Sequence, residues 1–587
     1  MCGILGYVGK NEIGSEVVFD GLKRLEYRGY DSWGIASAQK NEFRIFKKVG
    51  KIGNANPKLP KTNLAIGHTR WATHGKVTEI NAHPHLDCTK TIALVHNGIV
   101  ENYKTIKKEI TKKKHVFKSE TDTEVIVHLI EEYMKNKSFK EAVSQSFKRL
   151  KGLNAIVVCN LKTKEIAAVK NGTPIVAGKG SNNDFYISSD IVGISKHTNK
   201  LIFLDDNQLL TLGKTAELID VLTRKKLNIK VTKIKVNLIE ENKGKYDHFI
   251  QKEINEQPKI ISQIALNFEA NAKKLANLIK TAKGIFLVGC GSASFVCLAG
   301  TYLFSNIAKK HLNFSIGSEF KYLEDYLTNK TLVIPISQSG ETIDVLDSVK
   351  KAKIKRTKIA AITNVLGSSL YRVSDYNFLL SAGVEKAVLA TKSFTAMISI
   401  LYFAAKAFAE DSEDAKKKLL LASKNIKSIL SHNYLVKIRN LAKQLKDKKH
   451  IYVIGRGLSY PVALETALKI KESTYIHSEG FAGGELKHGA IALIEEGTPC
   501  IVITTNDETK DEILSNAMEI KARGGFMIGI GSVYDDVFDV FLKTDDLKYA
   551  TMLPQIVIAQ LLAYYITVLK GLDPDKPRNL AKSVTVK

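Results

Sequence analysis

The chain places a cysteine directly behind its initiator methionine, in the order Met1-Cys2-Gly3-Ile4. Removal of the methionine would leave Cys2 with a thiol whose reference pKa is about 8.5 and an α-amine whose reference pKa is about 7.7 to 8.0. The amine can act as the base for the thiol, so an N-terminal cysteine needs no second base from the fold. The pattern indicates a nucleophile, although without further support an accidental cysteine at position two is the simpler interpretation.

Three polar clusters in the first third of the chain offer groups that could surround such a nucleophile. They are residues 67–75 (GHTRWATHG), 96–102 (HNGIVEN) and 119–124 (SETDTE). Each cluster also has an ordinary structural interpretation. Asn97-Gly98 is a common turn, and Thr121-Asp122 can cap a helix that runs on through Val125. The residues alone leave both interpretations open.

A second set of reactive side chains lies in the last third of the chain. Glu465, Lys469 and Glu472 are spaced i, i+4 and i+7, which places them on one face of a helix. This spacing allows two interpretations. The three residues could form a surface ladder of salt bridges, or one carboxylate could be a catalytic acid and base, with its pKa raised from the reference value of about 4.3. His488 adds a group that titrates near neutral pH. Lys582 adds an amine near the C-terminus, where a disordered basic tail is the alternative.

Residues 337–342 (SQSGET) could bind a phosphate. Their three hydroxyls and one amide stand on a loop that enters a helix, beside backbone N–H groups and a positive helix end. An ordinary helix cap is the alternative. Gly289-Cys290-Gly291 invites a dinucleotide-binding interpretation, which is weak because Ser294 replaces the third glycine of GxGxxG.

A repeated unit must position these C-terminal groups. Residues 285–292 (IFLVGCGS) have the same pattern as residues 451–458 (IYVIGRGL), and the matching Gly289 and Gly455 are 166 residues apart. In each copy an apolar strand ends in a turn of small residues and leads into a helical pattern. We therefore predict two doubly wound α/β domains with parallel sheets, whose sites lie at the carboxyl ends of the strands.

The composition is that of a globular protein with three or four domains: 587 residues, 44% hydrophobic and 25% charged. The six cysteines include no CxxC pair, so we expect no disulfide framework, no metal site of the zinc type, and a reducing cytoplasmic compartment. The net charge of +27 is spread along the chain without an RNA-binding motif, so we expect no nucleic-acid partner. The apolar run 551–569 contains Pro554 and two glutamines and predicts a buried helix, hence no membrane partner.

The region around Cys2 resembles, in spacing and residue type, the glutamine amidotransferase domain of the N-terminal-nucleophile hydrolases. The resemblance covers residues 2–235 and implies an α+β sandwich with αββα layers, in which Cys2 attacks the side-chain amide of glutamine. By this resemblance, Asn97 and Gly98 form the oxyanion hole. Arg70 binds the α-carboxylate of glutamine, and Asp122 binds its ammonium group. The glutamine-binding positions together are Arg70, Trp71, Thr73, His74 and Asp122.

The two repeated copies resemble sugar isomerase (SIS) domains. The whole chain is similar to the family of isomerising glutamine:fructose-6-phosphate aminotransferases, also called glucosamine-6-phosphate synthases, most specifically in residues 337–342, 465–489 and 577–586. The resemblance implies that ammonia from Cys2 passes through an internal channel to fructose 6-phosphate and that the product is glucosamine 6-phosphate. It calls for no metal and no other cofactor.

The same resemblance assigns roles at the sugar site. Glu472 matches the residue that moves a proton between C2 and C1, His488 the residue that opens the cyclic sugar, and Lys582 the lysine that forms an imine at C2. Val584 and Val586 alternate with polar residues, and this pattern favours a C-terminal tail that packs against the protein over a disordered one. The expected sugar-phosphate-binding residues are Ser292, Ser337, Gln338, Ser339, Thr342, Glu465 and Lys469.

The expected organisation follows from these assignments. We expect an amidotransferase domain over residues 2–235 and a linker over residues 236–258, with a helix-like stretch before Pro258. Two SIS domains are expected over residues 280–415 and 447–575, and an active-site tail over residues 576–587. The family resemblance also implies a homodimer through the SIS half, with His488 contributed across the interface.

Two positions depart from the family pattern. Ala293 and Ala390 each stand where the family usually has a serine. A lost neutral hydrogen bond costs about 0.5 to 1.5 kcal/mol, so a related sugar phosphate becomes an alternative substrate. Two further functions stay open at this point: an amidotransferase acting on a phosphoribosyl substrate, and a sugar-phosphate sensor without catalytic activity.

Overall fold

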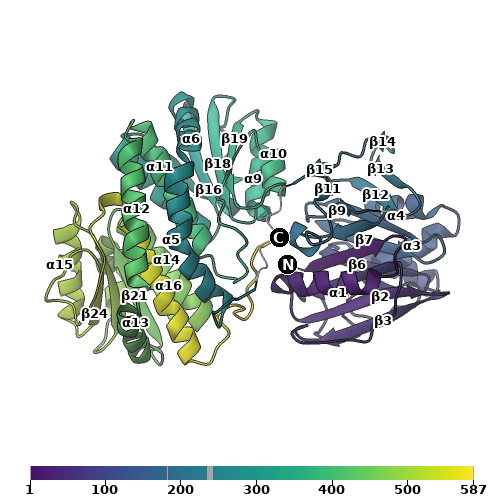
Figure 1. Ribbon diagram of the computed structural model, residues 1–587, viewed down its shortest axis with the longest axis horizontal. Helices are drawn as coiled ribbons and strands as arrows, with labels where there is room; N and C mark the ends of the chain where they lie inside the picture. Colours follow the sequence, from purple (N-terminus) through teal and green to yellow (C-terminus); the bar gives the residue numbers. More distant parts are fainter. Residues whose placement is uncertain (1, 182, 235–241, 586–587) are drawn as a thin grey trace. The chain divides into compact units, whose positions relative to one another are not determined.

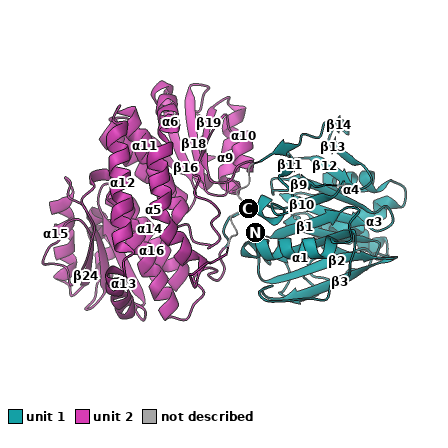
Figure 2. Cartoon of the chain, viewed as in Figure 1, with its two compact units in different colours: residues 1–240, 581–587 teal, residues 241–580 magenta. Residues whose placement is uncertain are grey.

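The computed structural model describes residues 2–181, 183–234 and 242–585 (Figure 1). The chain divides into two compact units, which are coloured separately in Figure 2. The N-terminal unit comprises Met1–Glu240 with Ala581–Lys587, and the C-terminal unit comprises Glu241–Leu580.

The N-terminal unit contains two antiparallel sheets. In sheet order, the eight-stranded sheet consists of β15 (Thr232–Lys233), β11 (Lys200–Phe203), β9 (Val176–Lys179), β10 (Phe185–Ser188), β1 (Gly3–Val8), β4 (Leu64–Arg70), β2 (Ser32–Gln39) and β3 (Glu42–Val49). The seven-stranded sheet consists of β14 (Lys226–Leu227), β13 (Ala216–Asp220), β12 (Gln208–Leu212), β8 (Glu165–Asn171), β7 (Asn154–Asn160), β6 (Ile92–Gly98) and β5 (His85–Leu86). Its α-helices are α1 (Gly14–Leu25), α2 (Tyr103–Lys112), α3 (Glu124–Met134) and α4 (Phe139–Arg149).

Side-chain alternation along the central strands creates the layers of this unit. On β1, Ile4 faces the core between the two sheets, whereas Leu5 packs with α1. On β6, Val95 faces the same central core, whereas Leu94 packs with α2, α3 and α4. Because successive strand residues point to opposite faces, each sheet can bury both faces. The αββα sandwich expected from the sequence is confirmed.

The C-terminal unit contains two five-stranded sheets in which every pairing is parallel. In sheet order, the first consists of β17 (Asn313–Ile316), β16 (Gly284–Gly289), β18 (Thr331–Ser337), β19 (Lys358–Thr363) and β20 (Tyr376–Leu379). The second consists of β22 (His477–Ala482), β21 (His450–Gly455), β23 (Pro499–Thr504), β24 (Phe526–Gly531) and β25 (Val540–Lys543). Both have the same doubly wound strand order, so the predicted repeat is confirmed.

Helices join the two copies of the repeat into one core. Residues from both copies belong to a single hydrophobic cluster, which includes Leu303, Leu401, Ile470 and Leu562. The helices are α5 (Phe249–Asn267), α6 (Glu269–Thr281), α7 (Ser292–Ala308), α8 (Gly317–Phe320), α9 (Ile343–Ile354), α10 (Ser369–Val373), α11 (Lys392–Phe408), α12 (Ser412–Ile429), α13 (His432–Leu445), α14 (Ser459–Thr474), α15 (Lys510–Lys521) and α16 (Met552–Leu569).

The most apolar helix of the chain belongs to this core. Lys548–Leu569 is long and apolar enough to cross a membrane by length and composition, but 89% of its most apolar window is buried inside the fold. The expectation of a buried helix in this run is therefore confirmed.

The helix-like stretch expected before Pro258 is part of α5, which continues through that residue to Asn267. Proline lacks the N–H that would bond the carbonyl of Ile254 one turn earlier. The buried side chain of Gln257 supplies the missing donor, since its Nε2 lies 3.2 Å from the Ile254 oxygen. Much of the segment expected to be linker is thus a structural helix of the C-terminal unit. Residues 235–241 of that expected linker lie outside the described residues.

Candidate active sites

Cys2 lies at the start of β1, the strand between β10 and β4 in the eight-stranded sheet. The backbone N–H of Trp71 donates to the Cys2 sulfur at 3.2 Å. The next residue is anchored as well, since Gly3 N donates to Thr69 Oγ1 at 3.0 Å. Burial raises the pKa of the Cys2 thiol. The sheet therefore holds the sulfur in a fixed place, and the Trp71 N–H favours its ionised form.

Asn97 and Gly98 end β6 in the facing sheet and reach the same place. Asn97 Nδ2 donates to the Cys2 carbonyl oxygen at 2.9 Å. An amide nitrogen carries two hydrogens, so one remains for another acceptor. Gly98 has a φ of +135°, and an added Cβ would collide with the carbonyl of Leu153. The structure thus places Asn97 against Cys2, with Gly98 as the next residue of the same strand.

His68 orients the Asn97 amide and had no role in the sequence prediction. Its Nε2 lies 3.0 Å from Asn97 Oδ1 and 3.0 Å from the His96 carbonyl oxygen. Both partners accept, so this nitrogen is the donor. Burial lowers the pKa of His68 to about 3, opposed by the bond to Asn97, so the imidazole is neutral at pH 7. His68 belongs to the cluster 67–75, and a polar residue on a buried strand was the signal that could have found it.

Arg70 and Asp122 are both buried and each fixes a neighbouring loop. The Arg70 guanidinium donates to the carbonyl of His74 and, at 3.2 Å, to that of Lys76. Asp122 Oδ2 accepts from the backbone N–H of Val100 at 2.7 Å. The alternative in which Thr121-Asp122 caps α3 is not what the structure shows, since the cap position is Thr123 and no side chain bonds the first turn.

The remaining residues of the expected glutamine pocket lie on the loop after β4. Trp71 is half-buried, Thr73 is exposed, and the His74 ring contacts Tyr103 edge-on at 5.6 Å between centroids. Asp31 was missed by the sequence prediction. Its Oδ2 accepts the Ala72 N–H at 2.9 Å and so ties this loop to the start of β2.

In the C-terminal unit, Glu465, Lys469 and Glu472 share one face of α14, as their spacing predicts. Lys469 Nζ lies 3.4 Å from Glu465 Oε1 and 2.7 Å from Glu472 Oε2. The side chains of Glu465 and Lys469 are each 1% exposed, which excludes a surface salt-bridge ladder. Burial raises the pKa of Glu465 to about 7, although Lys469 opposes the shift.

Ser292 joins this cluster from the other copy of the repeat. It is the first residue of α7, directly after the turn that follows β16. Its hydroxyl donates to Glu465 Oε1 at 3.1 Å and accepts from Lys469 Nζ at 3.1 Å. A polar cluster built from both copies therefore lies within the C-terminal unit.

The loop between β18 and α9 contains the residues expected to bind phosphate. The hydroxyls of Ser337 and Thr342 lie 3.0 Å apart, and Ser339 Oγ accepts the Glu341 N–H at 3.1 Å. Thr342 is the cap position of α9, but its side chain does not bond the first turn, so the alternative of an ordinary cap is not observed. Gln338 accepts the Asn364 N–H with its backbone carbonyl at 3.1 Å. The N-terminus of α9 thus opens beside several hydroxyls.

Two further residues are expected to be catalytic, His488 and Lys582. His488 is exposed at the end of the 3₁₀ segment Gly483–His488. Lys582 is half-buried and belongs to the segment that groups with the N-terminal unit. The tail docks differently from the prediction, because Val584 is 52% exposed whereas Ser583 and Thr585 are buried. Alternate residues of an extended chain face opposite ways, so the polar pair takes the inner face. Val586 lies outside the described residues.

The hydroxyls that follow Ala390 in the sequence, those of Thr391 and Ser393, both donate to Glu385. Ser393 Oγ donates to the buried Glu385 at 2.7 Å, and Glu385 also accepts the Thr391 N–H at 3.0 Å. Ala293 lies in the first turn of α7, beside Ser292. Both departures from the family pattern therefore leave the site with fewer hydroxyls.

Comparison with protein families supports the same division of the chain. The description "Glutamine amidotransferase domain" matches residues 54–235, and "SIS domain" matches residues 278–407 and 444–539. The glutamine–fructose-6-phosphate aminotransferases (isomerizing) of Pyrococcus horikoshii and Thermococcus kodakarensis are each 41% identical to this chain, over 100% of both chains.

Solved structures match the C-terminal unit. The C-terminal domain of glucosamine-fructose-6-phosphate aminotransferase from Francisella tularensis is 33% identical and covers 57% of this chain and 99% of its own, with a TM-score of 0.52. Tagatose-6-phosphate ketose/aldose isomerase from Escherichia coli shares the fold, at 19% identity over 56% of this chain and 95% of its own, with a TM-score of 0.50.

An N-terminal glutamine amidotransferase domain followed by two SIS domains defines an amidotransferase enzyme joined to a sugar isomerase module. Within that class, the chain belongs to the family of isomerising glutamine–fructose-6-phosphate aminotransferases, because relatives of that name match it over its full length.

Proposed function

We propose that the chain hydrolyses glutamine at Cys2 and uses the ammonia to convert fructose 6-phosphate into glucosamine 6-phosphate. The observation that carries the proposal is the pairing of Cys2 with an oriented Asn97 amide in a chain that also holds the buried Glu465–Lys469–Glu472 cluster. The first arrangement suits acyl transfer, and the second suits proton transfer on a sugar.

At the first site, the Cys2 sulfur attacks the side-chain carbonyl carbon of glutamine. Negative charge then develops on the former carbonyl oxygen, where Asn97 Nδ2 and the Gly98 N–H would donate. Collapse of the intermediate leaves a thioester and releases ammonia, and water hydrolyses the thioester to glutamate. Asp122 would hold the substrate ammonium. Arg70 would hold the α-carboxylate, with the loop 71–76 closing over it.

At the second site, the hydroxyls of residues 337–342 and the N-terminus of α9 would hold the sugar phosphate, because a helix N-terminus favours an anion. Lys582 would form an imine with C2 of the open sugar, after His488 has assisted ring opening. Ammonia would then attack C2 and displace Lys582 as the free amine, and Glu472 would move a proton between C1 and C2 of the resulting sugar imine, beside the charged Lys469. The exposure of His488 in a single chain fits a homodimer in which the partner completes the site. Such an enzyme would work in the cytoplasm, without nucleic acid or a membrane.

One assay tests the reaction. The purified chain receives glutamine with fructose 6-phosphate, and mass spectrometry detects the sugar product while glutamate is measured in parallel. We expect equal amounts of glutamate and an amino sugar phosphate. Glutamate without an aminated sugar would overturn the assignment of the acceptor. Tagatose 6-phosphate, offered in a second reaction, tests whether the missing serines at Ala293 and Ala390 have changed the preferred sugar.

A further inference from the structure

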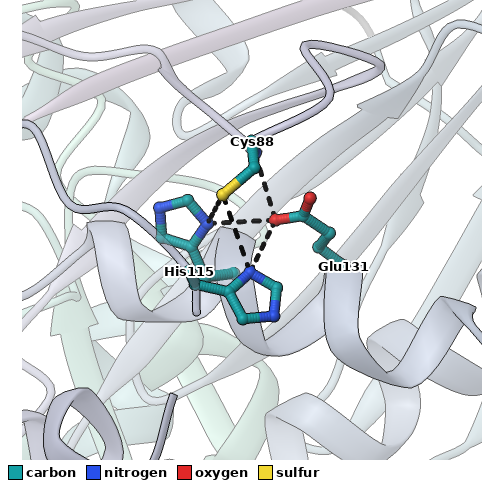
Figure 3. Close-up of side chains that lie close together, drawn as sticks. Cys88, His115 and Glu131 are labelled. Atoms are coloured by element: carbon teal, nitrogen blue, oxygen red, sulfur yellow. Dashed lines mark hydrogen bonds and ion pairs between the residues drawn. The ribbon is translucent and has the colours of Figure 1, made fainter. Parts of the chain in front are cut away.

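Four potential metal ligands converge in the N-terminal unit, away from Cys2. Cys88 lies on the turn between β5 and β6, His115 follows α2, and His128 and Glu131 lie one turn apart on α3. Their ligand atoms all lie within 4.8 Å of one another. Figure 3 shows Cys88, His115 and Glu131 pointing toward a common centre. We propose a tetrahedral zinc(II) site whose ligands are Cys88, His115, His128 and Glu131.

The distances fit the geometry of zinc. Cys88 Sγ lies 3.7 Å from His115 Nδ1 and 3.6 Å from His128 Nδ1. Glu131 Oε2 lies 2.9 Å from His115 Nδ1 and 3.1 Å from His128 Nδ1. Zinc bonds of about 2.0 to 2.3 Å place tetrahedral ligand atoms about 3.3 to 3.6 Å apart. The sulfur–nitrogen pairs are close to that spacing, and side-chain shifts of about 0.2 to 0.4 Å bring the nitrogen–oxygen pairs to it.

The outer contacts are those of a metal site. A histidine ligand commonly turns its second ring nitrogen to a carboxylate. His115 Nε2 lies 3.0 Å from Glu132 Oε2, and His128 Nε2 lies 3.7 Å from Glu124 Oε1. The Val116 N–H donates to Cys88 Sγ at 3.5 Å, which favours a thiolate. The bond to Glu132 holds His115 with Nδ1 toward the centre, whereas His128 Nε2 is beyond hydrogen-bond distance of Glu124 and its ring is placed by the contacts of Nδ1 with Cys88 and Glu131.

Charge balance favours a divalent cation over a network of hydrogen bonds alone. A thiolate and a carboxylate cancel the charge of zinc(II), and two neutral imidazoles complete the coordination, so the ion enters a nearly buried place without leaving net charge. Binding releases the thiol proton of Cys88. A network of charged histidines and carboxylates explains the nitrogen–oxygen contacts, but gives no reason for a sulfur beside both Nδ1 atoms.

The site would be structural, because four protein ligands leave no open position. It would join the turn after β5, the segment after α2, and α3. Glu124, on the outer side of His128, also accepts the N–H groups of Lys118 and Ser119. Zinc would thereby stiffen the segment that carries Asp122. No CxxC motif marks the site along the chain, since the ligands come from three separate segments.

Metal content tests the proposal directly. Full-length protein is produced with zinc supplied, dialysed against metal-free buffer and analysed by mass spectrometry of the elements. We expect one zinc per chain in the wild type, and loss of zinc in Cys88→Ser and His128→Ala. The matched control is Cys290→Ser, which removes a half-buried thiol from the other unit and should keep the zinc. Glu132→Gln should weaken zinc affinity about 10- to 100-fold in a chelator competition.

Cobalt gives a readout in the wild-type chain itself, which does not depend on the folding of any variant. Cobalt(II) added to the metal-free wild-type chain should give a thiolate charge-transfer band and the visible bands of tetrahedral coordination. Both should vanish in Cys88→Ser and persist in Cys290→Ser. A wild-type chain that carries no zinc and binds cobalt without a thiolate band would overturn the proposal, as would full zinc retention in Cys88→Ser. Neither outcome would contradict the proposed hydrolysis of glutamine at Cys2, which is measured by a separate assay.

Discussion

His68 decides which way the Asn97 amide points. Because its Nε2 donates to Asn97 Oδ1 at 3.0 Å, Asn97 Nδ2 is left to face Cys2. His68 therefore acts as a positioning residue, through an amide that would otherwise rotate freely between two orientations. Nε2 is the donor because both of its partners accept, and burial lowers the pKa of His68 so that this N–H belongs to a neutral imidazole.

Replacement of His68 should lower glutaminase activity selectively. We predict that His68→Leu, which removes the donor, lowers kcat for glutamate release on the order of a hundredfold, as losing an oxyanion donor does. His68→Gln keeps a donor and should lose less, and ammonium-dependent amination should persist in both. Equal losses in the two variants at equal thermal stability would contradict the orienting role.

The buried histidines should make the N-terminal unit sensitive to acid. Burial lowers the pKa of His68, His83, His85 and His96, that of His68 to about 3. In the unfolded chain these groups titrate at about 6.5, so below that pH the unfolded state binds protons that the folded state does not. Their contribution to stability is therefore complete above about pH 6.5 and is lost as the pH falls toward 3. Urea unfolding followed at decreasing pH should show this loss. His68→Gln should flatten the dependence, and an unchanged slope would contradict it.

At the scale of elements, α5 depends on one glutamine. Gln257 Nε2 lies 3.2 Å from the Ile254 carbonyl oxygen and 2.7 Å from Gln560 Oε1 of α16. Its Oε1 accepts from Thr395 Oγ1 of α11 at 2.8 Å. One fully buried side chain thus repairs the break at Pro258 and joins three helices.

Gln257→Leu should be strongly destabilising. It leaves three buried polar groups without this partner, and each costs about 1 to 3 kcal/mol, so we expect a loss of several kcal/mol in the unfolding free energy of the C-terminal unit. The matched control is Gln251→Leu, a half-buried position on the same helix that loses a single hydrogen bond, from the Asp247 N–H at 3.3 Å, and should therefore cost only about 0.5 to 1.5 kcal/mol. Urea unfolding of both variants measures the difference. Similar midpoints would show that the three helices do not depend on Gln257.

At the scale of the whole molecule, the Cys2 site belongs to the N-terminal unit, whereas the Glu465–Lys469–Glu472 cluster belongs to the C-terminal unit and Lys582 lies on the tail that groups with the N-terminal unit. We predict that Cys2→Ala abolishes glutamine use but leaves amination with ammonium measurable, because only the thiol of the first site is lost. Lys582→Arg should do the reverse, since a guanidinium is too basic to form an imine at neutral pH. Glutamate release and amino sugar formation, measured with glutamine and with ammonium, separate the two. Retained glutaminase activity in Cys2→Ala would contradict the first assignment.

Much of this organisation could be predicted from the sequence because it is local. The strand-turn-helix pattern around Gly289 and Gly455 indicated the repeat, and the i, i+4, i+7 spacing placed Glu465, Lys469 and Glu472 on one helical face. The continuation of α5 through Pro258 could not be predicted, because the compensating side chain bonds helices distant in sequence. The tail was mispredicted at Val584, where apolar character alone said nothing about which face of the extended chain is covered.

The sequence by itself determined the repeat, its doubly wound α/β units and the chemical groups in play, because strand patterns and helical spacing are properties of neighbouring residues, whereas the αββα layers were expected from the family resemblance. Only the tertiary structure decided that the face of α14 is buried and meets Ser292 from the other copy, and that His68 orients Asn97. It alone also assembled Cys88, His115 and the α3 pair. Burial and contacts between distant segments set pKa values and ligand geometry, and neither can be read from spacing along the chain.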